Sequence, residues 1–115
     1  MIKVLHNNDC SKSRAILEFL DENGLEFQIH DIVSNPLSED ELRSVVKMLG
    51  ATPHDITRKN EKFFKDNFEG KNLSDDELYE ILTENPELIQ RPILVKGSVA
   101  VIGRPIENAR MFLQD

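Results

Sequence analysis

The sequence has only one cysteine among its 115 residues and no tryptophan. A single cysteine cannot form an internal disulfide, so folding needs no oxidising compartment. Basic residues are also scarce, because 14 lysines and arginines stand against 21 aspartates and glutamates, for a formal net charge of −7. This charge repels phosphate backbones, and we expect no nucleic-acid partner.

Long hydrophobic runs are missing as well. No apolar stretch is long enough to cross a bilayer, and the first residues show no signal-peptide pattern. We therefore expect a cytoplasmic protein with no membrane partner. The length and the hydrophobic fraction of 39% suit a single domain over residues 1–115, and we expect a monomer.

Apolar periodicity predicts a strand, a helix and a second strand in the first third of the chain. Residues 2–5 form an apolar run, and a polar turn and a helical pattern that stops at Asn23-Gly24 follow. Residues 26–33 then alternate loosely, as in a strand. Two strands separated by a helix are expected to pair in parallel.

The middle of the chain predicts helices. Ser38 with Glu41 and Ser74 with Glu77 are capping-box patterns, and each precedes apolar residues at helical spacing. We expect two amphipathic helices on either side of a less regular stretch at residues 52–72.

The last part of the chain changes to period two. Residues 93–95 and 99–102 predict a hairpin, and Pro105 predicts the start of a final helix. The order is therefore βαβ, helices, ββα. This order predicts an α/β, thioredoxin-like three-layer fold with a mixed sheet and a helical subdomain inserted at about residues 36–88.

Cys10 is the candidate nucleophile, although a lone cysteine is more often a small buried hydrophobe. It lies in a polar turn between a strand and a helix, where free N–H groups at the helix start stabilise a thiolate. Lys12, Arg14 and His6 add positive charge nearby, whereas Asp9 opposes them. We expect the balance to lower the pKa of the thiol.

The same turn can hold an oxyanion. Backbone N–H groups of residues 11–14 and the hydroxyls of Ser11 and Ser13 can donate hydrogen bonds to it. The positive charges of Lys12 and Arg14 can attract it. A phosphatase loop of the C-x5-R kind is disfavoured, because only three residues separate Cys10 from Arg14. The C-x-x-S pattern also lacks a second thiol, so an external thiol must release any disulfide at Cys10.

Four segments together resemble one family. Residues 6–14, HNNDCSKSR, resemble the H-N-P-x-C-x-x-S-R segment of the glutaredoxin-coupled arsenate reductases, with Asn8 in place of proline. Three further motifs of the family are matched in the same order by Arg58-Lys59-Asn60, Arg91-Pro92-Ile93 and Gly103-Arg104-Pro105. The resemblance extends over essentially the whole chain.

The resemblance implies an oxidoreductase that reduces arsenate to arsenite. Cys10 would form a thiol–arsenate adduct, glutathione would attack it as co-substrate, and glutaredoxin would reduce the resulting mixed disulfide. Arg58, Arg91 and Arg104 would bind the oxyanion.

The resemblance also gives roles to residues around the thiol. His6 would help to keep the thiol ionised, and Ser13 would hydrogen-bond to the sulfur. Pro92 matches the position at which thioredoxin-like folds hold a cis-proline beside the active thiol.

Two alternatives stay open. One is a glutathione-dependent thiol reductase with another substrate. The other is a non-enzymatic transcription regulator that docks on RNA polymerase, although Ser13 replaces the second cysteine of the redox switch in such relatives.

We expect no tightly bound cofactor and no metal. His30 and His54 have no acidic or cysteine partner at a ligand spacing and are interpreted as structural. Phe63, Phe64 and Phe68 are expected in the core.

Overall fold

A four-stranded mixed sheet forms the centre of the protein. The computed structural model describes residues 1–6 and 11–113, and the side chains of residues 11–13 and 113 lie outside the description. The strand order is β2-β1-β3-β4, with bounds β1 (Ile2–His6), β2 (Phe27–Asp31), β3 (Ile93–Lys96) and β4 (Val99–Ile102). β1 is parallel to β2 and antiparallel to β3, and β3 is antiparallel to β4. The predicted α/β fold with a mixed sheet is confirmed.

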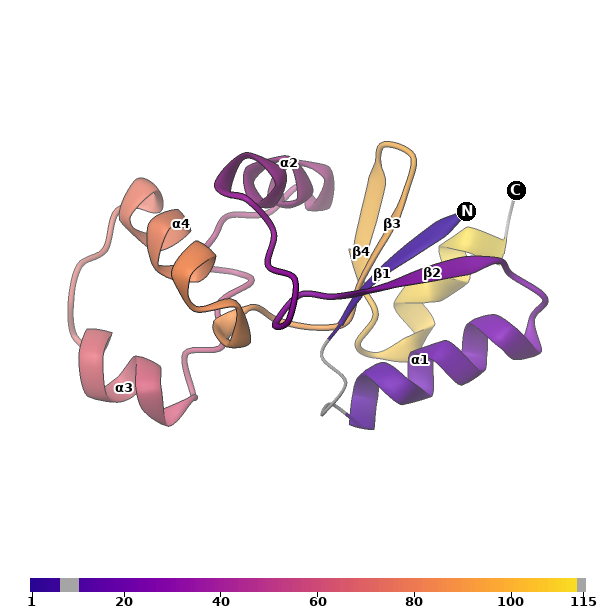
Figure 1. Cartoon of the computed structure of the whole chain (residues 1–115), viewed down its shortest axis with the longest axis horizontal. Helices are drawn as coiled ribbons and strands as arrows, with labels where there is room; N and C mark the ends of the chain where they lie inside the picture. Colours follow the sequence, from indigo (N-terminus) through magenta and orange to yellow (C-terminus); the bar gives the residue numbers. More distant parts are fainter. Residues whose placement is uncertain (7–10, 114–115) are drawn as a thin grey trace.

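Two helices cover one face of the sheet (Figure 1). They are α1 (Ser11–Glu22) and the 3-10 helix η2 (Ile106–Leu113). Ile2 and Val4 of β1 point to this face, because alternate residues of a strand share a side. They pack with Ile16 of α1 and with Ala109 and Phe112 of η2 in one buried apolar cluster. This cluster fixes α1 against β1, the strand that precedes Cys10 in the sequence.

The inserted helices pack toward the opposite face. They are α2 (Glu39–Leu49), α3 (Lys62–Phe68), α4 (Asp75–Glu84) and the short 3-10 helix η1 (Pro86–Leu88). Leu5, Ile93 and Ala100 of the sheet join a second buried cluster with residues of these helices. Figure 1 shows α3 and α4 at the end of the molecule far from α1. None of the helices in the described ranges is long and apolar enough to span a membrane.

Both predicted capping boxes are present. The Ser38 hydroxyl accepts a hydrogen bond from the Glu41 N–H at 3.1 Å, and the Glu41 carboxylate accepts one from the Ser38 N–H at 3.0 Å. Ser74 and Glu77 form the same pair of bonds at the start of α4. The caps satisfy N–H groups that a helix leaves free at its start.

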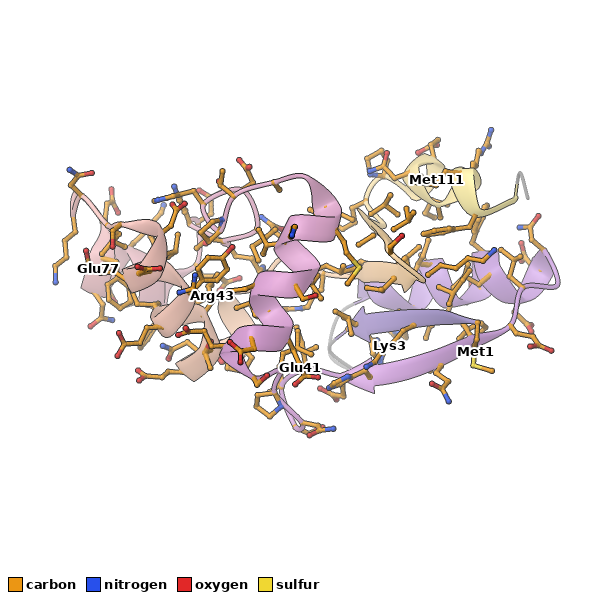
Figure 2. All side chains as sticks on the ribbon, turned by 90° about the horizontal axis from the view of Figure 1, so that it is seen from above. Met1, Lys3, Glu41, Arg43, Glu77 and Met111 are labelled. Carbon is orange, nitrogen blue, oxygen red and sulfur yellow. The ribbon has the colours of Figure 1, made fainter. Side chains whose placement is uncertain are left out.

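Arg43 joins α2 to α4 (Figure 2). Its guanidinium lies 2.8 Å from the Asp76 carboxylate and 3.2 Å from that of Glu39, and 4.3 Å above the ring of Tyr79. An arginine can use its charge and its flat face at once, so one side chain contacts both helices.

The structure corrects three details of the prediction. α3 lies inside the stretch expected to be less regular, and its Phe63 is 45% exposed rather than in the core. β2 is shorter than residues 26–33, because the Asp31 carboxylate accepts hydrogen bonds from the N–H groups of Val33 and Ser34 and turns the chain. The final helix is 3-10 and begins at Ile106, after a cis Arg104–Pro105 bond.

The cap at the start of α2 predicts a pH-dependent contribution to stability. Hydrogen bonds from Ser38 lower the pKa of the Glu41 carboxyl, and the charges of Lys3 and His30 lower it further. A lowered pKa stabilises the fold above the ordinary glutamate value of about 4.3, and this stabilisation is lost as the pH falls through the folded-state value. Figure 2 shows Glu41 and Lys3 near each other.

We expect Glu41→Gln to be less stable than the wild type at neutral pH, because glutamine keeps the hydrogen bond but not the charge at the helix start. The difference should shrink as the pH falls below 4.3. Urea unfolding at several pH values measures it, with the exposed mid-helix Glu80→Gln as the charge-matched control. A difference that grows toward low pH would contradict this assignment.

Candidate functional site

Two segments far apart in sequence are paired just before β3 begins. Thr57 and Ile89 form an isolated antiparallel bridge. The Arg58 N–H donates to the Leu88 carbonyl at 2.7 Å, and the Gln90 N–H donates to the Ile56 carbonyl at 2.7 Å. This pairing holds the segments that carry Arg58 and Arg91 side by side.

Arg58 and Arg91 meet at one backbone oxygen. Arg58 Nη1 donates to the Glu87 carbonyl at 3.2 Å, and Arg91 Nη1 donates to the same oxygen at 2.9 Å. Arg91 is buried, with 8% of its surface exposed, whereas 28% of the Arg58 side chain is exposed. The structure therefore brings together two of the three arginines that the resemblance assigns to the oxyanion, and one of the two is buried.

Pro92 follows Arg91 through a cis peptide bond, the geometry that the resemblance predicts at this position. Its carbonyl accepts a hydrogen bond from the Gly103 N–H at 2.8 Å. A side chain at Gly103 would lie 3.1 Å from Pro92 Cγ and 3.3 Å from Ile16 Cγ1 of α1. A Cβ at this position would therefore be crowded between Pro92 and α1.

Arg104 follows Gly103 in the chain and so lies next to the contact between Gly103 and Pro92. It is half-buried and lines a pocket of about 410 Å³ with Ala15 of α1 and with Gly103, Pro105 and Ile106. The Asn108 side-chain amide donates to the carbonyls of Ile102 and Arg104, at 2.9 and 3.3 Å, and so closes the turn. Arg104 is placed beside α1 and next to the residue that contacts Pro92. No contact joins its guanidinium to the Arg58–Arg91 pair among the described residues.

The candidates around the thiol are described only in part. Cys10 and the side chains of Ser11, Lys12 and Ser13 lie outside the described residues. His6 is the last residue of β1, is 2% exposed, and pairs in register with Asp31 of β2. Arg14 is exposed on the first turns of α1.

Sequence reasoning missed two parts of this site. Glu61 forms an ion pair with Arg58 Nη2 at 2.6 Å, which the opposite charges of two residues only three positions apart could have indicated. The Glu87 carbonyl gave no signal, because a backbone oxygen has no signature in the sequence. Glu61 matters for anion binding, since its carboxylate competes with an oxyanion for the same guanidinium.

The arrangement suits an oxyanion rather than a cation. Two guanidinium groups gather on one side of the cis-proline turn, and arginine presents N–H groups in a fork that matches planar or tetrahedral oxyanions. In the described part of the chain, no three His, Cys, Asp or Glu side chains lie close enough together to hold a metal ion.

The contact at Gly103 predicts the effect of one methyl group. We expect Gly103→Ala to destabilise the protein by about 1–3 kcal/mol, the usual cost of overpacking, because the new Cβ would be crowded by Pro92 and Ile16. Ile16→Ala removes the crowded Cγ1 atom, so the cost of Gly103→Ala should be smaller in that background. Denaturant unfolding of the four proteins of this cycle measures the coupling, and strictly additive effects would contradict the contact.

Comparison with known proteins places this site in a family. The sequence model of the ArsC family matches residues 5–112. The chain is 33% identical over 114 residues to "Arsenate reductase" of Neisseria meningitidis serogroup B, with 97% of each chain covered. It is 37% identical over 109 residues to "Uncharacterized protein YfgD" of Escherichia coli K12, covering 93% of this chain and 92% of the relative.

Two further comparisons mark the range of the family. "Global transcriptional regulator Spx 2" of Bacillus anthracis is 30% identical over 114 residues, covering 98% of this chain and 87% of the relative. The solved structure of "Arsenate reductase from Vibrio cholerae" superposes with a TM-score of 0.86 at 35% identity, covering 92% of each chain. The protein with this paired-arginine site therefore belongs to the ArsC family.

Proposed function

We propose that the protein is an arsenate reductase that uses glutathione and glutaredoxin as reductants. The observation that carries the proposal is the meeting of Arg58 and Arg91 at the Glu87 carbonyl, next to the cis bond before Pro92. Two cationic forks at one place supply the charge and the N–H donors that an arsenate dianion needs.

The position of Cys10 supports a nucleophilic thiolate. α1 begins at Ser11, so Cys10 immediately precedes the free N–H groups of a twelve-residue helix. The partial positive charge at such a helix start favours the thiolate over the thiol. Ser11, Lys12 and Arg14 of this first turn are proposed to contribute to the oxyanion cradle, with Arg104 from the adjoining turn.

The proposed reaction uses two thiols. The Cys10 thiolate attacks arsenic, an S–As bond forms, and one oxygen leaves as water. Glutathione then attacks the Cys10 sulfur, so that an S–S bond forms, the S–As bond breaks, and its electron pair reduces As(V) to As(III). Arsenite leaves. Because the chain has a single cysteine, the Cys10–glutathione disulfide is released by an external thiol, here that of glutaredoxin.

His6 and Ser13 are proposed to assist the thiol, His6 by helping to keep it ionised and Ser13 by a hydrogen bond to the sulfur. The burial of His6 at the end of β1, four residues before Cys10, supports a fixed position for its imidazole.

Turnover should depend on Cys10 and Arg91. In a coupled assay with glutathione, glutaredoxin, glutathione reductase and NADPH, we expect Cys10→Ser to abolish arsenate-dependent NADPH oxidation. Arg91→Lys keeps the charge but loses the fork, and should lower kcat/KM for arsenate by about 10–100-fold, the usual value of a charged hydrogen bond. The exposed Arg110→Lys is the matched control and should retain wild-type kinetics. Full activity of Cys10→Ser would overturn the mechanism.

Glu61 gives an independent test of the arginine pair. Because its carboxylate holds Arg58 Nη2 at 2.6 Å, Glu61→Gln should free that guanidinium for substrate and lower the KM for arsenate. Glu80→Gln removes the same charge from an exposed position on α4 and should change KM less. Equal shifts in the two variants would show that net charge alone acts, without a specific role for Glu61.

A transcription regulator is the second candidate, favoured by the 30% identity to Spx 2. Such a protein would bind RNA polymerase and would not turn over arsenate. Ser13 stands where the C-x-x-C redox switch of these relatives has its second cysteine. Retention of purified RNA polymerase on the immobilised protein, together with no arsenate turnover, would favour the regulator over the enzyme.

A further inference from the structure

Figure 1 shows α3 at the end of the molecule far from α1. A pocket of about 430 Å³ lies against this helix. It is bounded by the loop before α3, by α3 itself and by the connection from α3 to α4. Arg58, Arg91 and Arg104 do not line it. The residues that give the pocket its character are Lys59, Lys65, Lys71, Phe64, Phe68 and Glu69.

The pocket gathers positive charge in a protein that is otherwise acidic. Lys59, Lys65 and Lys71 line it, and within the described ranges none of the three forms an ion pair with a carboxylate. Lys62, on the same helix as Lys65, is by contrast paired with Asp66 at 2.6 Å. The carboxylate that lines the pocket is that of Glu69. Three lysines and one glutamate leave about two net positive charges there.

Two of these ammonium groups lie beside groups other than carboxylates. Lys59 Nζ lies 3.2 Å from His54 Nδ1. The other ring nitrogen of His54 lies 3.7 Å from the Asp75 carboxylate. Lys71 Nζ lies 5.8 Å from the centroid of the Phe68 ring. Neither arrangement cancels the lysine charge, so both cations stay available to a ligand.

One wall of the pocket is aromatic. Phe64 is 6% exposed and Phe68 is half-buried, and their ring centroids are 5.6 Å apart. The ring planes are tilted by 48°, so the half-buried Phe68 ring is the apolar face that a planar group can reach, and the buried Phe64 ring supports it. The Asn60 side chain, which also lines the pocket, can donate or accept hydrogen bonds.

We propose that this pocket binds a small organic phosphate that carries a flat apolar group. A phosphate monoester carries about −1.5 to −2 charges at neutral pH, which matches the charge of the pocket better than a monocarboxylate does. Lysine binds phosphate as a point charge, and the phenylalanines accommodate the flat group. The volume falls within the range of small-molecule sites, about 300–1,000 Å³.

Phenyl phosphate is the probe, because it combines a dianion with one aromatic ring. It is titrated into the ¹⁵N-labelled full chain, and the amide shifts are followed by NMR. We expect saturable shifts at residues 59–60, 64–65 and 68–71. Inorganic phosphate, which lacks the ring, and benzoate, which carries one charge, should bind the pocket more weakly. Phenyl phosphate is also an oxyanion and can bind at the arginine site. Shifts near Arg91 and Arg104 report binding at that site and are fitted separately.

The lysines are tested in pairs. Lys65→Gln with Lys71→Gln should weaken phenyl phosphate binding at the pocket by about tenfold, since each exposed cation contributes modestly. Lys3→Gln with Lys47→Gln removes the same charge from exposed positions outside the pocket lining and should change the affinity less than about twofold.

Shifts confined to the arginine site, an equal loss in both double variants, or benzoate binding as tightly as phenyl phosphate would each overturn the proposal. Arsenate turnover by the Lys65→Gln, Lys71→Gln protein separates this pocket from the proposed enzyme site. This variant should lose phenyl phosphate binding at the pocket and keep wild-type arsenate turnover.

Discussion

The pairing of residues 56–58 with residues 88–90 is the constraint on which the candidate site depends. It brings the segment between α2 and α3 next to the segment that leads into β3. Without it, Arg58 and Arg91 would be separated by more than thirty residues of helix and loop. With it, both donate to the Glu87 carbonyl, and Arg58 also pairs with the Glu61 carboxylate. The helical insertion therefore positions charge as well as filling space.

The packing of the sheet against α1 is the second constraint on the candidate site. Gly103 lets the turn after β4 approach the side chains of both Pro92 and Ile16, so that the hairpin, the cis-proline segment and α1 pack closely. This close packing sets the start of α1 relative to Arg91. The thiol at Cys10 precedes that helix in the sequence, and we infer that the nucleophile and the arginine pair act on one oxyanion.

Local signals in the sequence predicted the elements whose structure is locally determined. Ser38 and Ser74 each carry a capping glutamate three residues on, and both helices begin where those pairs indicate. The helix α3 escaped prediction because seven residues give only two turns, and only Phe64 among its aromatics is buried. The Arg58–Arg91 contact could not be read from spacing, because its geometry depends on a long-range backbone pairing. The four-motif resemblance named those arginines, and the fold supplied the reason that two of them meet.

The central claim is that arsenate binds at this site and is reduced by Cys10 and one glutathione. The most direct measurement is a single turnover without glutaredoxin, in which intact-protein mass spectrometry and arsenite analysis follow the chain after it is mixed with arsenate and glutathione. The account predicts that each chain gains one glutathione at Cys10, that one arsenite appears per chain, and that neither forms when arsenate is omitted. Glutathione addition that is independent of arsenate, or arsenite release without a Cys10 adduct, would contradict it.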